Sequence, residues 1–145
     1  MSVTISGINH FAVSVRSLEE SIEWYQRVLG FKLICINELD KINVKAAHME
    51  GPGMVLELFE AQNASQIPEY RRYPNTDLKV HGNKHFALSI EDREQTKREL
   101  RELGVGTIMI ADVWDTYGIF IRDPTGNLIE LFEGDMRDHV SDKKQ

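Results

Sequence analysis

The stretch His10-Phe-Ala-Val-Ser-Val15 decides the fold, because it returns nearly unchanged as His85-Phe-Ala-Leu-Ser-Ile90. A second stretch, Val55-Leu-Glu-Leu-Phe-Glu60, returns as Leu128-Ile-Glu-Leu-Phe-Glu133. The two returns are offset by 75 and 73 residues, respectively. Self-similarity at a nearly fixed offset indicates a duplicated structural unit. The sequence therefore predicts one module of roughly that length, present twice.

Each copy is predicted to form a strand, a helix and three more strands. The first stretch alternates large apolar side chains with His, Ala and Ser, which is typical of a strand with one buried face. Ser17 and Asp92 stand at helix N-cap positions, and Gly30 and Gly104 stand where those helices should end. The later strands are expected at about 31–38, 42–50 and 54–61, and again at about 105–111, 117–122 and 127–133. This order of elements places the chain in the α+β class.

The chain is expected to form a single domain, 1–145, built from the two tandem modules. The first module should span about 5–61, a polar connector about 62–82, and the second module about 83–134. The second helix has the thinner apolar stripe, so we expect it to be the more exposed of the two. Residues 135–145 are charged and have little to bury, which predicts a frayed tail.

The composition argues against several classes of function. A formal net charge of −6 and a pI near 5.4 disfavour a general nucleic-acid binder, which would show a basic stripe. No apolar run approaches the roughly 18 residues of a membrane span, and the N-terminus lacks the features of a signal peptide. Cys35 is the only cysteine, so an intrachain disulfide cannot form. We therefore expect a cytoplasmic protein whose partner is a small molecule.

Two His and two Glu residues recur at matching places in the repeat. His10 and His85 begin the first strand of each copy, whereas Glu57 and Glu130 lie in the last strand among large apolar side chains. Such a carboxylate is costly to bury unless it is paired or bound to a cation. The four residues are therefore predicted to hold one divalent metal, with positions left open for water or substrate. Imidazole and carboxylate ligands suit Ni, Co, Zn, Fe or Mn, while the lack of thiolates argues against structural zinc. The alternative is a duplication whose site has lost its metal.

Several aromatic and cationic residues are candidates for substrate binding. They are Tyr70, Arg71, Arg72, Trp114, Tyr117 and Phe120. The Tyr-Arg-Arg run in the connector could hold an anionic or planar substrate, or it could be an ordinary linker surface. The aromatic residues near 114–117 could line the site, although core packing or a dimer contact would explain them equally well. His48, His81 and His139 have no partner in the repeat and are expected to be ordinary residues.

These motifs resemble the vicinal oxygen chelate superfamily, which includes glyoxalase I, methylmalonyl-CoA epimerase, extradiol dioxygenases and fosfomycin or bleomycin resistance proteins. The resemblance covers residues 7–133. It is carried by the two His-Phe-Ala stretches, by the helix that contains Trp24-Tyr25 and ends in Val28-Leu-Gly-Phe31, and by Arg122-Asp-Pro-Thr-Gly-Asn-Leu-Ile-Glu130. It implies paired βαβββ modules whose mixed sheets form a cup around the metal, and it implies a homodimer.

The ligand set is most similar to that of glyoxalase I, in which all four matching residues bind the metal. Extradiol dioxygenases carry a catalytic Tyr at the position of Phe120. Ser14 and Ala61 stand where bacterial glyoxalase I uses Arg and Asn to bind glutathione. The resemblance therefore implies a glyoxalase-like metal site whose activity is not strictly dependent on glutathione.

The leading hypothesis is a metal-dependent lyase or isomerase of the glyoxalase type. It would chelate two neighbouring oxygens of a small substrate and stabilise an enediolate, with Ni, Co or Zn favoured and Glu130 and Glu57 moving the proton. Which carboxylate is the base stays open. One alternative is an Fe(II)-dependent oxygenase that uses His10, His85 and Glu130, with Fe as the metal. Another is a drug-binding resistance protein that performs no chemistry.

Overall fold

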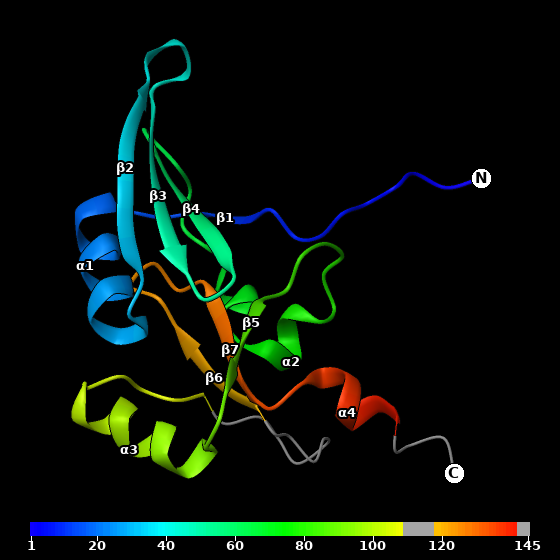
Figure 1. Cartoon of the computed structure of the whole chain (residues 1–145). Coiled ribbons are helices and arrows are strands. Elements are labelled where there is room, and N and C mark those ends of the chain that lie inside the picture. Colours follow the sequence, from blue (N-terminus) through cyan, green and yellow to red (C-terminus); the bar gives the residue numbers. More distant parts are fainter. Residues whose placement is uncertain (109–117, 142–145) are drawn as a thin grey trace. The chain divides into compact units, whose positions relative to one another are not determined.

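A computed structural model describes residues 1–108 and 118–141 of the chain (Figure 1). The chain divides into two compact units, Met1–Gln66 and Ile67–Gln145. Each predicted module lies within one of these units, and most of the predicted connector belongs to the second. None of the helices in the described part of the chain has the length and apolar character that a membrane span requires.

The first unit follows the predicted order of one strand, one helix and three strands. Its elements are β1 (His10–Ser14), α1 (Leu18–Leu29), β2 (Lys32–Leu39), the 3-10 helix η1 (Asp40–Ile42), β3 (Val44–Gly51) and β4 (Met54–Ala61). The four strands form one sheet in the order β1-β4-β3-β2. β1 runs parallel to β4, while β3 pairs antiparallel with both of its neighbours.

The second unit repeats this topology. Its elements are η2 (Glu69–Arg71), α2 (Pro74–Asp77), β5 (Phe86–Ile90), α3 (Arg93–Glu102), β6 (Gly118–Arg122), β7 (Leu128–Glu133) and α4 (Met136–Ser141). β5 runs parallel to β7, and β6 pairs antiparallel with β7, as β1, β4 and β3 do in the first unit. The duplication and the α+β class are thus confirmed. Of the strand predicted at 105–111, the structure describes one bridge, from Ile108 to Phe120, and residues 109–117 lie outside the described part.

The two repeated helices differ in burial as predicted. α1 packs on its sheet and buries Leu18, Ser21, Ile22 and Tyr25, whereas α3 buries Leu100. Both begin at the predicted N-caps, because Ser17 and Asp92 accept hydrogen bonds from the backbone N–H groups three residues later. Gly30 ends α1 in the left-handed conformation at φ 69°, which favours glycine.

A carboxylate from the last strand of each unit also holds the helix to its sheet. Leu18 N, at the start of α1, donates to Glu60 Oε2 at 2.6 Å, and Arg93 N, at the start of α3, donates to Glu133 Oε1 at 2.9 Å. A negative charge is favourable at a helix N-terminus. The final Glu of each repeated hexapeptide therefore fixes a helix, which explains why it recurs in both copies.

The frayed tail that we expected from 135–145 is wrong as far as the structure describes it, and residues 142–145 lie outside the described part. Residues 136–141 form α4, and Asp135 begins it by accepting hydrogen bonds from both the backbone and the side chain of Arg137. The guanidinium of Arg137 lowers the pKa of the Asp135 carboxyl to about 2. Asp135 and Arg137 thus stabilise the start of a helix, where an unfolded tail was expected.

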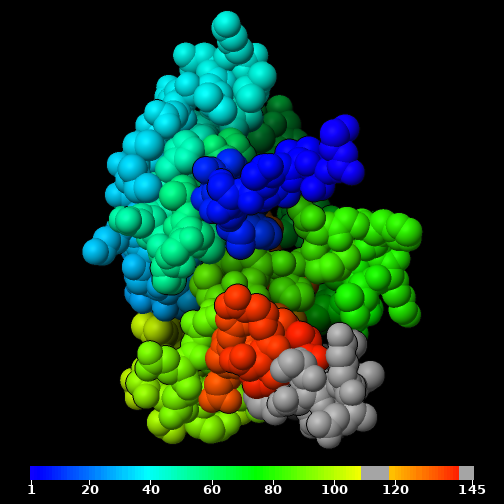
Figure 2. All heavy atoms as spheres, turned by 45° about the vertical axis from the view of Figure 1, so that its right-hand side comes forward, coloured from blue at the N-terminus to red at the C-terminus, as the bar shows by residue number. Residues whose placement is uncertain are grey.

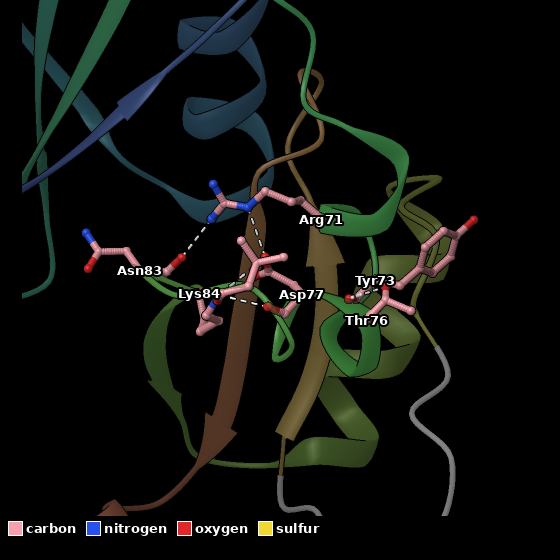
Figure 3. A network of polar contacts seen from close by, with 7 residues as sticks. Arg71, Tyr73, Thr76, Asp77, Asn83 and Lys84 are labelled. Atoms are coloured by element: carbon pink, nitrogen blue, oxygen red, sulfur yellow. Dashed lines mark hydrogen bonds and ion pairs between the residues drawn. The ribbon is translucent and has the colours of Figure 1, made fainter.

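The connector is ordered around one buried carboxylate, Asp77. Arg71 Nε donates to Asp77 Oδ1 at 2.9 Å, and Lys84 Nζ lies 3.5 Å from the same oxygen and donates to the Asp77 carbonyl (Figure 3). Arg71 Nη2 also donates to the carbonyl of Asn83 at 2.8 Å. These contacts hold the segment that leads into His85.

The edge of the first sheet is exposed along its whole length. All eight residues of β2 are exposed, and the hairpin of β2 and β3 (cyan in Figure 2) projects from the rest of its unit. The N-terminal residues 1–9 (blue) are exposed as well.

Candidate metal centre

In the first unit, His10 and Glu57 lie on one face of the sheet. Ala12 pairs with Glu57 across β1 and β4, so His10, two residues earlier in β1, projects from the same face. His10 Nε2 lies 3.6 Å from Glu57 Oε2. The His10 side chain is 49% exposed and the Glu57 side chain 19% exposed, so the pair is accessible from solvent.

In the second unit, His85 and Glu130 form the matching pair. His85 Nε2 lies 3.0 Å from Glu130 Oε2, and Glu130 is buried in the sheet. The ring of Phe120, the residue paired with Glu130 across β6 and β7, meets the His85 ring edge-on at 4.9 Å. A carboxylate in such apolar surroundings gains little solvation and is stabilised by any nearby cation.

The structure thus brings each predicted His together with the predicted Glu of its own module. Within either unit, the described residues contain no group of three or more His, Cys, Asp or Glu side chains that could hold a metal alone. Each unit therefore holds one of the two predicted His–Glu pairs.

The contact made by His48 is not predicted by the sequence. His48 was expected to be an ordinary residue, but its Nε2 lies 2.9 Å from Glu57 Oε1. On the other side of the ring, His48 Nδ1 lies 3.7 Å from Cys35 Sγ. The available signal was the tight turn at Gly51-Pro52-Gly53, because its length sets the hairpin register that pairs His48 with Glu57.

Gly118 leaves the space that the Glu130 carboxylate occupies. A Cβ built on Gly118 would collide with Glu130 Oε1, which is the movable end of a side chain. We expect Gly118→Ala to turn this carboxylate away and to weaken metal binding by about tenfold or more, while costing at most about 1–2 kcal/mol of unfolding free energy. Calorimetric metal titration and thermal unfolding would measure the two effects.

The matched control for this prediction is Gly106→Ala. An added Cβ on Gly106 meets no atom of the described residues within 4 Å, so both metal affinity and stability should stay close to those of the parent. If Gly118→Ala binds metal as tightly as Gly106→Ala does, the position of the Glu130 carboxylate does not matter for the metal.

A family model described as Glyoxalase/Bleomycin resistance protein/Dioxygenase superfamily matches residues 7–131. The chain belongs to this superfamily. The resemblance seen in the motifs is therefore confirmed. Members of the superfamily are mostly metalloenzymes that bind a divalent metal and act on small molecules.

Two relatives illustrate the range of the superfamily. Glyoxylase I 4 from Arabidopsis thaliana is 28% identical over 132 residues, which cover 88% of this chain and 70% of the relative. The metallothiol transferase FosB from Staphylococcus haemolyticus (strain JCSC1435) is 28% identical over 145 residues, which cover 97% of this chain and 93% of the relative.

A solved superfamily structure shares the fold. The fosfomycin resistance protein FosX from Listeria monocytogenes, complexed with Mn(II) and a sulfate ion, has a TM-score of 0.69 at 17% identity. The match covers 94% of this chain and 99% of that chain.

The substrate-binding candidates of this superfamily member lie in different settings. Tyr70 is exposed in η2, and the Arg71 guanidinium is engaged by Asp77 and Asn83 (Figure 3). Arg72 lies 3.6 Å from Glu69 through Nη1. Phe120 is buried against His85, and the remaining candidates, Trp114 and Tyr117, lie outside the described residues.

The two other histidines without a partner in the repeat lie in the connector and on α4. His81 is exposed in the connector. His139, on α4, packs edge-on against the Phe132 ring at 5.2 Å and lies 3.1 Å from the Glu133 carbonyl through Nε2.

Proposed function

We propose that this protein is a metal-dependent lyase or isomerase of the glyoxalase type. One observation carries the proposal: a His–Glu pair occurs in each unit at the same place in the repeat, His10 with Glu57 and His85 with Glu130. We propose that these four side chains bind one divalent metal, with Ni, Co or Zn favoured.

The donor set fits such a metal. Neutral imidazole and carboxylate are suitable ligands for Ni, Co and Zn. Glu130 has 11% of its side chain exposed and faces His85, Gly118 and Phe120, so a bound cation would offset the cost of its buried charge. Within each unit the His nitrogen and the Glu oxygen lie 3.6 and 3.0 Å apart, a separation that two ligands of one ion can have.

When bound, the metal would polarise two neighbouring oxygens of a small hydroxy- or oxo-substrate. The two Glu side chains would then move the proton on the carbon between those oxygens, one as base and the other as acid. His10 and His85 would stay bound to the metal as ligands.

The substrate of this proposed enzyme need not carry glutathione. Ser14 and Ala61 occupy the positions at which the resemblance to bacterial glyoxalase I would require Arg and Asn. Tyr70, Arg72 and Phe120 are proposed to contact the substrate, and Arg71 is proposed to order the connector beside them through Asp77.

Elemental analysis of protein purified without oxygen tests this function. About one Ni, Co or Zn per chain is expected, with the content reduced in both Glu57→Ala and His85→Ala. Two matched controls, Glu50→Ala and His81→Ala, remove exposed residues of the same types and should keep the metal.

The other outcomes separate the rival functions. Iron that is retained in Glu57→Ala but lost in His85→Ala would indicate the oxygenase, which needs two His and one carboxylate. A parent protein that takes up no metal even after reconstitution would overturn both enzymes and leave the drug-binding protein.

A further inference from the structure

We infer that His48 is a positioning residue for Glu57, and that Cys35 fixes the His48 ring for this task. The inference rests on the proposed function, because it assigns His48 to the carboxylate of the proposed metal centre. His48 is outside the repeat: no histidine occupies the matching place in the second unit.

The observation is a continuous row of polar side chains across the first sheet. Cys35 pairs with His48 across β2 and β3, and His48 pairs with Glu57 across β3 and β4, so all three side chains project from one face. Asn37 Nδ2 donates to Cys35 Sγ at 3.5 Å, Cys35 Sγ lies 3.7 Å from His48 Nδ1, and His48 Nε2 lies 2.9 Å from Glu57 Oε1.

The row has a direction. A thiol can donate its hydrogen to an unprotonated ring nitrogen, so Cys35 S–H facing His48 Nδ1 favours the tautomer that carries its hydrogen on Nε2. His48 Nε2–H then donates to Glu57 Oε1. This leaves Oε2 as the oxygen that faces His10, at 3.6 Å.

The second unit lacks this support. The positions that match His48 and Cys35 in the register are Phe120, opposite Glu130, and Ile108, opposite Phe120. Neither side chain can donate a hydrogen bond. The two carboxylates of the repeat are therefore not equivalent: besides the histidine of its own pair, Glu57 has a donor on the neighbouring strand, whereas Glu130 has the apolar Phe120 there.

Stability alone does not explain the row. Cys35 and Asn37 are exposed, and the His48 side chain is 30% exposed, so water would satisfy these groups nearly as well in its absence. Hydrogen bonds to ligating side chains, by contrast, orient metal ligands and typically change metal affinity by about 10- to 100-fold. The row ends on the Glu57 carboxylate, which faces His10, so its arrangement is suited to orienting a metal ligand.

Cobalt titration of the full chain, followed by visible absorption, tests the inference. His48→Phe copies the second unit and removes the donor, and we expect it to weaken Co(II) binding by about 10- to 100-fold and to shift the absorption bands. His48→Gln keeps an N–H donor near the position of Nε2 and should bind within about threefold of the parent. His81→Gln is the matched control at an exposed histidine and should match the parent.

A readout without metal accompanies the titration. The imidazole nitrogen chemical shifts of His48 in the metal-free protein should show the hydrogen on Nε2, and Cys35→Ala should weaken that preference. Circular dichroism and thermal unfolding would establish that each variant is folded. If His48→Phe does not fold, His48→Leu serves as a second variant without a donor.

Four results would overturn the inference. Co(II) binding by a folded donor-free variant that equals the parent's would show that Glu57 needs no donor. Equal and severe losses in His48→Phe and His48→Gln would make His48 a direct ligand, and a hydrogen on Nδ1 would reverse the row. Absence of cobalt binding by the parent would overturn the proposed metal centre as well, which distinguishes its failure from that of His48 alone.

Discussion

Glu130→Gln is expected to abolish metal binding while making the metal-free protein more stable. Glu130 is the more buried of the two carboxylates, with 11% of its side chain exposed against 19% for Glu57. Gln keeps the shape and can still hydrogen bond to His85 but carries no charge to desolvate. Loss of a ligand should cost at least the roughly 100-fold in affinity that loss of a supporting residue can cost, and the unfolding free energy of the metal-free protein should rise by about 1 kcal/mol.

Glu133→Gln, three residues along the same strand, is the control for this prediction. Its carboxylate accepts a hydrogen bond from Arg93 N at the start of α3, so its loss should lower stability and leave metal affinity unchanged. Calorimetry with metal and thermal unfolding after chelation would measure both quantities. A Glu130→Gln protein that binds metal like the parent would remove Glu130 from the ligand set.

Asp123→Ala is expected to lower the free energy of unfolding of the second unit by about 3 kcal/mol. Asp123 is buried in the turn between β6 and β7, and its carboxylate accepts hydrogen bonds at 2.8–3.0 Å from the backbone N–H groups of Thr125, Gly126 and Asn127 and from Asn127 Nδ2. Alanine would leave these donors without their acceptor, and buried donors without a partner are costly. Because β7 follows directly, metal affinity should fall as well.

Asp92→Ala is the matched control for Asp123→Ala, because it removes an exposed carboxylate that accepts one backbone hydrogen bond, at the start of α3. It should cost about 1 kcal/mol and leave the metal site intact. Urea unfolding of both variants would compare the two losses. Equal losses would show that the turn carboxylate is no more than an ordinary cap.

The sequence by itself determined the duplicated fold, because both copies contain the same local signals. Alternation in the first strand, an N-cap after it and a glycine after the helix are short-range properties that each segment carries alone. The four candidate ligands were found for the same reason, since a His and a Glu recur in register with the strands. The His–Glu pairing within each unit follows from the parallel contacts of β1 with β4 and β5 with β7.

Tertiary structure alone decided the features that depend on strand register and on contacts distant in the sequence. His48 meets Glu57 because a tight hairpin sets their register, and a shift of one residue would turn His48 to the opposite face. Glu60 and Glu133 reach helix N-termini about 40 residues earlier, a contact that no local pattern encodes. Gly118 is important because the Glu130 carboxylate occupies the space that a side chain at position 118 would take. Local sequence therefore specified the repeated elements, whereas packing specified how the two carboxylates of the repeat came to differ.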